Sequence, residues 1–287
     1  MSDGLQLRIF EGGYCVHPGF VVKPGSGLKP RAFPAAVALI KHPEQGYVLF
    51  DTGYHQHFFD ATRTFPERFY AWTTPCHLQH GEDITAQLGR IGIDTPQVNH
   101  LVLSHFHADH IAAMSEFGHA AIHCSKTGFD AIKHRGRFSG VRKGYLRQLI
   151  PDDIHQQLHF HDRFDRRIEE LLPQLHGVEL YCKDLFDDGS LYLVSLPGHA
   201  AGQMGMLVRL QAQWVFLLAD ACWLIESLSD NLDQHWLANI ICEDTKAYRQ
   251  TLAQLRLCYR LAKAEIQFVP SHCLTSIRAL CEQGWLR

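Results

Sequence analysis

Leu101-Val-Leu-Ser-His-Phe-His-Ala-Asp-His110 places four metal-binding side chains within six positions, directly after a short apolar strand. In an extended segment, residues i and i+2 face the same way, so His105 and His107 can bind one ion. Asp109 and His110 begin the next helix and turn toward a second ion. Imidazole and carboxylate groups are the ligands of zinc and related first-row metals. The chain has 20 histidines, so chance clustering is the alternative, but the position at a strand end favours a metal site.

Three further polar residues complete the set, and each follows an apolar strand at or just beyond its C-terminal tip. They are His199, Asp220 and His272. Ligands at strand tips converge on one rim of a sheet, where a site can exist without burying unpaired charge. A lone histidine is more often an ordinary core or loop residue, so the prediction rests on the ordered set.

Hydrophobic periodicity predicts an α/β protein. Strands are expected over 6–10, 35–41, 47–51, 100–104, 120–124, 191–196, 205–210, 214–219 and 266–269. Helices are expected over 82–91, 109–117, 126–134, 163–172, 244–264 and 276–283, and the clearest has Leu252, Leu255, Tyr259 and Ala262 at helical spacing. Each half of the chain has strands first and helices after, which favours two packed sheets with helices outside.

Composition excludes several classes of protein. The chain has 287 residues, of which 46% are hydrophobic, and its net charge of −3 argues against nucleic acid as a partner. Its nine cysteines are scattered, with no C-x-x-C pair, so we expect free thiols in a reducing, cytoplasmic compartment. No signal peptide and no apolar run long enough for a membrane span is found. The G-x-S-x-G, Walker, G-x-G-x-x-G and H-E-x-x-H motifs are also absent from the sequence.

The ordered set of motifs resembles the metallo-β-lactamase superfamily. The set comprises the H-x-H-x-D-H run, Pro197-Gly-His199, the strand-end Asp220 and the late His272, together with Leu49-Phe-Asp-Thr-Gly53. The resemblance covers most of the chain. It implies a four-layer αββα sandwich of two mixed β-sheets flanked by helices, as a single domain over 1–287. Insertions near 54–82 and 125–180 are then predicted to cover the active site.

The resemblance also implies ligand roles and chemistry. His105, His107 and His199 would bind one zinc ion, Asp109, His110 and His272 would bind a second, and Asp220 would bridge them. Other first-row divalent metals remain open. A hydroxide between the two ions would attack a carbonyl ester, with Asp109 orienting it and passing its proton to the leaving group. The resemblance gives Asp51 either a structural role or a role behind the metal ligands, and not a catalytic one.

Within the superfamily, the chain is most similar to the N-acyl homoserine lactone lactonases, through Pro197-Gly-His-Ala-Ala-Gly202, Leu218-Ala-Asp-Ala-Cys-Trp223 and Ser271-His272. The resemblance predicts a carboxylic ester hydrolase that acts on a small molecule. One position differs, because those lactonases usually have a tyrosine where this chain has Trp223. An indole can donate from its N–H but cannot act as a phenol.

The substrate pocket is predicted from aromatic residues. The segment from Tyr54 to Trp72 is rich in aromatic side chains, which either form the wall of an apolar pocket or pack a loop onto the body. The predicted pocket residues are Trp223, Phe58, Phe59, Phe69 and Tyr145.

Other histidines are not expected to bind metal. His55 and His57 copy the H-x-H spacing without a D-H partner and are predicted to be non-ligands. His155, His159 and His161 are predicted to be surface residues.

Two alternatives to a lactonase remain open. The segment 126–150 is basic, which indicates either a solvated face or a lid that meets an anionic substrate. The lid would favour a thioesterase or a phosphodiesterase. A non-catalytic sensor is the other alternative, although such proteins normally lose a ligand and none is missing here. The sequence is also compatible with a homo-oligomer.

Overall fold

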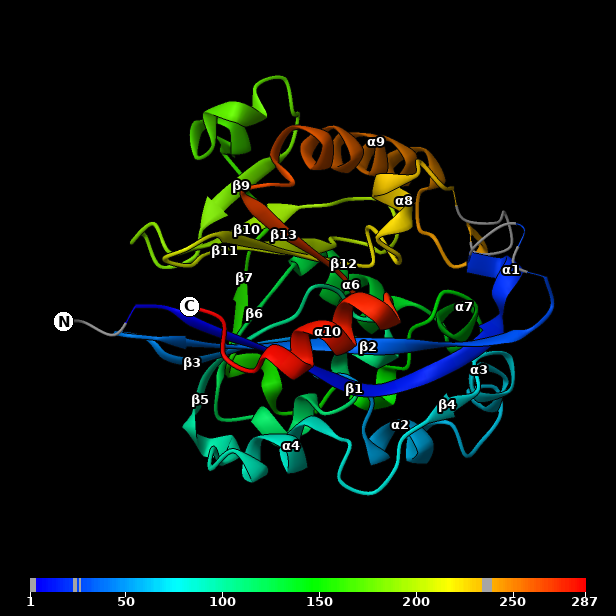
Figure 1. The fold of residues 1–287 in the computed structure, drawn as a ribbon. Helices are drawn as coiled ribbons and strands as arrows, with labels where there is room; N and C mark the ends of the chain where they lie inside the picture. Colours follow the sequence, from blue (N-terminus) through cyan, green and yellow to red (C-terminus); the bar gives the residue numbers. More distant parts are fainter. Residues whose placement is uncertain (1–3, 23–24, 26, 234–238) are drawn as a thin grey trace.

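The computed structural model describes residues 4–22, 25, 27–233 and 239–287. Two β-sheets lie face to face, with helices on their outer faces (Figure 1). The first sheet contains β1 (Gln6–Pro18), β2 (Pro30–His42), β3 (Gly46–Phe50), β4 (Cys76–His77), β5 (Val98–Val102), β6 (Ala121–Cys124) and β7 (Leu158–Phe160). The second contains β8 (Arg166–Arg167), β9 (Tyr181–Asp184), β10 (Leu191–Ser195), β11 (Met204–Arg209), β12 (Trp214–Ala219) and β13 (Ile266–Pro270).

Both sheets mix parallel and antiparallel pairs. The seven-stranded sheet has the order β4-β1-β2-β3-β5-β6-β7. Strands β3, β5, β6 and β7 are parallel to one another, and the β1–β4, β1–β2 and β2–β3 pairs are antiparallel. The six-stranded sheet has the order β13-β12-β11-β10-β9-β8, and only its β12–β13 pair is parallel among the described strands. The predicted sandwich of two mixed sheets flanked by helices is confirmed.

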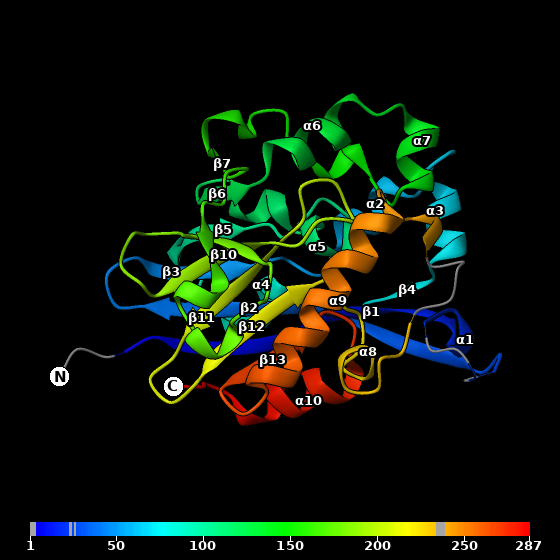
Figure 2. The same cartoon turned by 90° about the horizontal axis from the view of Figure 1, so that it is seen from above.

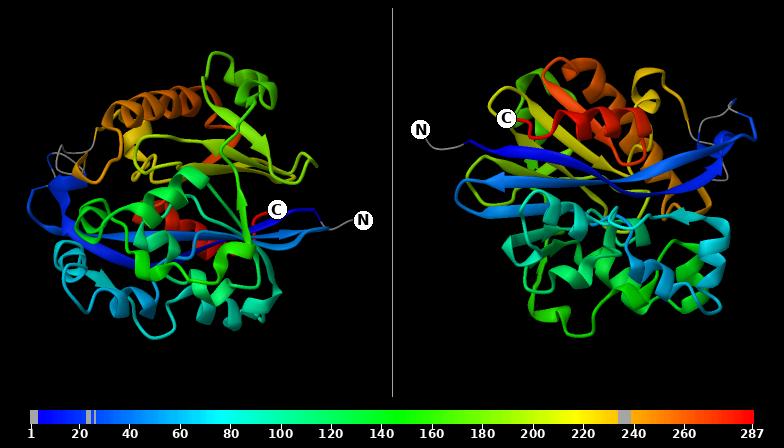
Figure 3. Two further views of the ribbon diagram at one scale, coloured as in Figure 1. Left: turned by 180° about the vertical axis from the view of Figure 1, so that it is seen from behind. Right: turned by 60° about the horizontal axis from the view of Figure 1, so that its bottom comes forward.

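The helices are mostly short. They are α1 (Gly19–Val22), α2 (Gln56–Ala61), α3 (Arg68–Thr73), α4 (Ile84–Arg90), α5 (Ala108–Ile111), α6 (Lys126–His134), α7 (Arg137–Arg142), α8 (Glu226–Ser229), α9 (Thr245–Ala262) and α10 (Leu274–Gln283). The long helix α9 lies across the outer face of the six-stranded sheet (Figure 2). Helix α10 packs beside β1 (Figure 3). Beyond the end of this helix, Leu286 N donates to Leu7 O at 2.7 Å.

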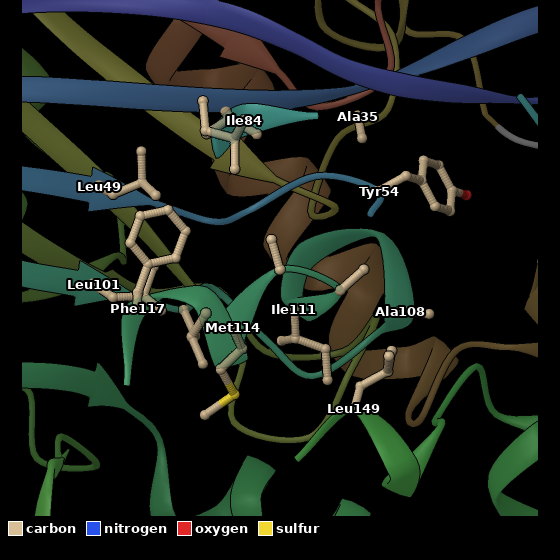
Figure 4. Close-up of a cluster of buried hydrophobic side chains, with 14 of the residues drawn as sticks. Ala35, Leu49, Tyr54, Ile84, Leu101, Ala108, Ile111, Met114, Phe117 and Leu149 are labelled. Atoms are coloured by element: carbon tan, nitrogen blue, oxygen red, sulfur yellow. The ribbon is translucent and has the colours of Figure 1, made fainter. Parts of the chain in front are cut away.

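Alternating side chains of the strands build the core on both faces of each sheet. In β2, Ala38 and Ile40 point between the two sheets, whereas Val37 and Leu39 point to the outer layer. Figure 4 shows part of that outer layer, in which Leu49 and Leu101 meet side chains of the helical segments. Both sheets are therefore buried on two faces, which fixes their strand register.

Helix α9 shows why this part of the sequence is helical. The Asp244 carboxylate accepts hydrogen bonds from the main-chain N–H groups of Lys246 and Ala247, at 2.8 and 3.0 Å, and so caps the first turn. Tyr248, Thr251, Leu252, Leu255, Cys258 and Ala262 then form its buried face. The predicted Tyr259 is only partly buried at the edge of this face.

The prediction of a helix over 163–172 is wrong. The segment contains the short strand β8 and a 3-10 helix over Ile168–Glu170. Only Ile168 and Leu172 are buried hydrophobic residues here, so the two can be buried without a regular helix. The short strands β4, β7 and β9 were not predicted, because two to four residues are too few to show a period.

Candidate metal centre

Two groups of buried ligands meet at one rim of the sandwich. His105, His107, His199 and Asp220 form the first group, and Asp109, His110 and His272 form the second. Within each group the ligand atoms lie within 4.8 Å of one another. None of these residues is more than 7% exposed. The structure thus brings together all the residues that the sequence placed at the metal centre.

The strands explain this convergence. In the six-stranded sheet, β12 and β13 run in parallel and Ala219 pairs with Pro270, so Asp220 and His272 emerge side by side. In the other sheet, β3 and β5 also run in parallel, and Asp51 N donates to Val102 O at 2.9 Å. Strand ends from both sheets therefore meet at one rim.

Asp220 lies between the two groups. Its Oδ1 atom is 3.2 Å from His110 Nε2, and its Oδ2 atom is 3.2 Å from both His199 Nε2 and His272 Nε2. One carboxylate therefore faces imidazoles of both groups, an arrangement that suits a ligand shared by two cations.

Hydrogen bonds behind the ligands fix their ring orientation. His110 Nδ1 donates to Asp51 Oδ2 at 2.8 Å, and His272 Nδ1 donates to the Pro34 carbonyl at 2.7 Å. With the proton on Nδ1, each ring presents the lone pair of Nε2 to the centre. Such partners set the tautomer and basicity of metal-binding histidines.

The fit to a metal ion can be tested on His105. Ser104 Oγ donates to Asp51 Oδ2 at 2.7 Å and accepts from His105 Nδ1 at 2.9 Å. His105 Nε2 is then buried without a hydrogen-bond partner in the part of the chain that the structure describes. A buried lone pair without a partner is costly, and a cation in the first group would satisfy it. The donor set therefore fits a first-row divalent ion.

The electrostatics favour the metal-binding form of Asp220, His105 and His107. Burial alone would raise the pKa of the Asp220 carboxyl, but the surrounding imidazoles, led by His272, hold it well below its usual range. Burial and neighbouring imidazoles lower the pKa of His105 and His107 well below the usual value. At neutral pH Asp220 is a carboxylate and the two rings are neutral.

The backbone at the site adopts conformations that are uncommon for residues with a side chain. Asp51 has φ of 60° and Ala219 has φ of 47°, both at strand ends that lead into the centre. Gly198, next to His199, has φ of 127°, and a Cβ there would lie 2.0 Å from Tyr248 N. The close approach of α9 therefore requires glycine before this ligand.

A cavity of about 550 Å³ opens beside the ligands. Phe69 and Trp223, two of the predicted pocket residues, line it together with His107, Asp109, Asp220 and His272. Phe58 is not among the lining residues and is fully buried in the outer core layer. Phe59 and Tyr145 do not line the cavity either, and both pack against the same layer.

Three further lining residues had no signal in the sequence, and two others lie in segment 126–150, for which a lid was one of the two predicted interpretations. Cys15, His17 and Phe33 come from β1 and β2, and Phe138 and Arg142 come from α7. Strands β1 and β2 are both longer than predicted, and their extra length lies beside the site. The hydrophobic pattern in the sequence predicted strands only over 6–10 and 35–41, so it did not indicate these additional residues.

Trp223 makes a contact that the sequence could not predict. Its Nε1–H donates to Asp220 Oδ2 at 3.0 Å. Its ring also meets the rings of His199 and His272 edge-on, with centroids 5.7 and 6.0 Å away. The indole therefore contacts the central carboxylate and one ligand from each group.

Comparison with known proteins agrees with this geometry. Residues 30–221 match the metallo-beta-lactamase superfamily, so the chain belongs to this family and is a metal-dependent hydrolase. It is 27% identical over 214 residues, or 72% of each chain, to N-acyl homoserine lactonase AttM of Azorhizobium caulinodans. It is 24% identical over 265 residues, or 84% of each chain, to N-acyl homoserine lactonase AiiB of Agrobacterium fabrum.

Solved structures show the same fold. An N-acyl homoserine lactone hydrolase, with N-hexanoyl-L-homoserine bound at its catalytic metal centre, superposes with a TM-score of 0.73 at 17% identity over 97% of each chain. AidC, a dizinc quorum-quenching lactonase, superposes with a TM-score of 0.61 at 17% identity, covering 96% of this chain and 89% of AidC.

Proposed function

We propose that this chain is a lactonase that binds two zinc ions and opens a cyclic ester with an apolar arm. The observation that carries the proposal is the position of the Asp220 carboxylate. Its Oδ1 atom faces His110, and its Oδ2 atom faces both His199 and His272. The similarity to the AttM and AiiB lactonases supports the substrate class. A member that uses one ion would not need a carboxylate in this position.

The ligand roles follow the two groups. His105, His107 and His199 would bind one zinc ion, and Asp109, His110 and His272 the other, with Asp220 shared. Two zinc ions, when bound, supply Lewis acidity that polarises a carbonyl oxygen and makes water acidic enough to attack at neutral pH.

Asp109 is the residue that we assign to proton transfer. It lines the cavity, and its Oδ2 atom is 3.6 Å from Nε2 of both His110 and His272. Its carboxylate would accept a hydrogen bond from the attacking water, take its proton and deliver it to the alkoxide that leaves as the ring opens. The products are a free carboxylate and a hydroxyl on one molecule.

The cavity supports an apolar arm on the substrate. Phe33, Phe69, Phe138 and Ile240 are among its lining residues, and α3 and α7 contribute parts of the two predicted insertions. Burying an alkyl chain here would contribute roughly 0.8 kcal/mol per methylene group. We therefore expect preference for longer acyl chains, and we propose that segments 54–82 and 125–180 cover the active site.

Metal analysis and turnover together test the proposal. The purified chain should contain about two zinc ions, and chelation should abolish lactone hydrolysis. A chain with fewer than one bound metal and no metal-dependent turnover would contradict it.

The basic segment 126–150 bears on the alternative of an anionic substrate. Arg142 lines the catalytic cavity, but Lys143 Nζ donates to the main-chain carbonyls of Ile240 and Cys242. Lys133, Arg137 and Arg147 line a separate pocket of about 430 Å³. A thioesterase or phosphodiesterase substrate would therefore meet one cation of this segment. Arg142→Gln should raise KM for an acyl-CoA more than for a neutral lactone if this alternative holds, with Arg147→Gln as the control.

The cellular compartment and the oligomeric state of the protein stay predictions. None of the nine cysteines forms a disulfide, and we propose a reducing, cytoplasmic compartment. Among the described residues, no helix has the length and apolar character needed to cross a membrane. We propose a small molecule as the substrate, and an assay of oligomeric state would show whether the chain self-associates.

A further inference from the structure

A second set of metal-type side chains lies outside the catalytic centre. His55, His57 and Glu116 each offer a ligand atom, and these atoms lie within 4.8 Å of one another. The sequence predicted His55 and His57 to be non-ligands because no further ligand follows them closely. The structure supplies Glu116, 59 positions from His57 in the chain.

We propose that His55, His57 and Glu116 form a third metal site, which takes a first-row divalent ion such as Zn²⁺. Two imidazoles and one carboxylate are a ligand set that suits these ions. The proposal is independent of the lactonase activity, because none of the three residues lines the catalytic cavity.

The geometry is already close to that of a site. His57 Nε2 lies 2.8 Å from Glu116 Oε1, and the His55 and His57 rings have centroids 4.3 Å apart with 50° between their planes. The His57 and Glu116 side chains are 40% and 38% exposed, so an ion can enter from solvent and keep water in its remaining positions. The alternative explanation is an ordinary surface ion pair between His57 and Glu116.

The site joins two segments that also support the catalytic centre. His55 caps the start of α2, which directly follows Asp51 to Tyr54, and Glu116 belongs to a 3-10 helix just after α5. Thr52 already ties these segments together. Its N–H and its Oγ1 both donate to His110 O, and its Oγ1 accepts from Ala113 N at 3.1 Å.

An ion at the third site would therefore link the same two segments a second time. It would stabilise the folded chain without touching the substrate. We expect it to raise the melting temperature and leave lactone turnover nearly unchanged.

Zinc titration of the chain with its catalytic ions in place tests this proposal. The wild type should bind about one more ion than His57→Ala or Glu116→Gln, and zinc should raise its melting temperature by a few degrees more than theirs. His134→Ala, which removes an exposed histidine of α6, is the matched control and should behave as the wild type. Glu116→Gln keeps the side-chain shape, so it answers the question even if His57→Ala folds poorly.

A second comparison separates this site from the catalytic one. The double variant His107→Ala, Asp220→Ala should lose the catalytic ions and still bind one zinc that His57→Ala removes. Equal zinc content in wild type and both site variants would overturn the proposal. Failure of lactone hydrolysis, by contrast, would count against the proposed function and leave the third site standing.

Discussion

The catalytic centre and a chain of histidines elsewhere in the same protein use one residue type in opposite ways. This histidine chain consists of His100, His123 and His161. His100 Nδ1 lies 3.0 Å from His123 Nε2, and His123 Nδ1 lies 3.0 Å from His161 Nε2. Lys183 Nζ lies 3.5 Å from His161 Nδ1 and can only donate. Each ring then donates to the next, and every ring is neutral.

The pKa of His199 in the catalytic centre moves in the opposite direction to the pKa values of the histidine chain. In the histidine chain, burial and neighbouring imidazoles lower the pKa of His123 to about 3. Burial and Lys183 lower the pKa of His161 to about 4. In the catalytic centre, burial acts the same way on His199, yet Asp220 raises its pKa to about 9.

The difference lies in the carboxylates. Asp109 and Asp220 stand among the catalytic imidazoles, whereas the influences on His123 come from other imidazoles and a lysine. Histidines around the buried His123, on which no carboxylate acts, form a neutral hydrogen-bonded chain, whereas histidines packed around carboxylates form a site that attracts cations. Removing a carboxylate should therefore weaken metal binding at the catalytic centre, and lowering the pH should destabilise the neutral histidine chain.

Asp220→Asn should have the largest effect. The change removes the negative charge that both ligand groups share, so we expect loss of at least one zinc ion and a fall in kcat/KM of about 1000-fold or more. Metal content and lactone turnover of the purified variant measure this. His123→Gln, which alters the other histidine group, should keep both ions and most activity. Near-normal turnover of Asp220→Asn would show that the carboxylate is not a metal ligand.

Asp51→Asn should have an intermediate effect. Asp51 does not reach the ligand positions itself, but it accepts from His110 Nδ1 and from Ser104. Loss of such a partner typically weakens metal binding by about 10- to 100-fold. Zinc affinity measured by chelator competition should fall in this range, while circular dichroism stays unchanged. An unaltered zinc affinity would mean that Asp51 acts only on the fold.

The sequence was sufficient to predict which side chains gather at the candidate metal centre, because they lie at or just after strand ends. His199, Asp220 and His272 follow apolar strands of five or six residues, and the periodicity of β12 gave its bounds correctly. The family resemblance added the proposed shared role of Asp220, which spacing alone does not give.

The contacts behind the ligands could not be predicted. Pro34 accepts from His272, a residue 238 positions away, through a main-chain carbonyl that any residue type would offer. His161 was predicted to be a surface residue, yet it is partly buried and bonded to His123, because strands β6 and β7 pair in parallel. The contact between Glu116 and His57 likewise joins residues that are 59 positions apart in the sequence. Such contacts depend on tertiary packing, which leaves no local pattern.

The histidine chain should make stability depend on pH. The folded pKa of His123 is about 3, well below the usual 6.5, so between these values the unfolded state binds a proton that the folded state does not. Stability is therefore full above about pH 7 and is lost as the pH falls through 6.5 toward 3, by about 2 kcal/mol at pH 5 for this group. Urea unfolding at pH 7 and pH 5 measures the loss.

His123→Gln is the comparison for that measurement, because glutamine keeps a polar side chain that does not titrate. Its stability should fall less than that of the wild type between pH 7 and pH 5, even if it starts lower. Both proteins keep the same proposed metal ligands, so acid release of any bound metal affects them alike. Equal pH dependence in the two proteins would mean that His123 titrates normally.

Substitution of Trp223 should have the smallest effect, and we expect it to change lactone turnover rather than metal binding. Its indole N–H is bound to Asp220, so it offers the substrate carbonyl no donor, whereas a phenol at this position could reach into the cavity. We expect weak wild-type turnover of short-chain homoserine lactones and a several-fold rise in Trp223→Tyr. Trp223→Phe is the matched control, because it removes the N–H without adding a hydroxyl and should not show the rise. Strong wild-type turnover of short lactones, unimproved by tyrosine, would show that residue 223 acts only on Asp220 and not on the substrate.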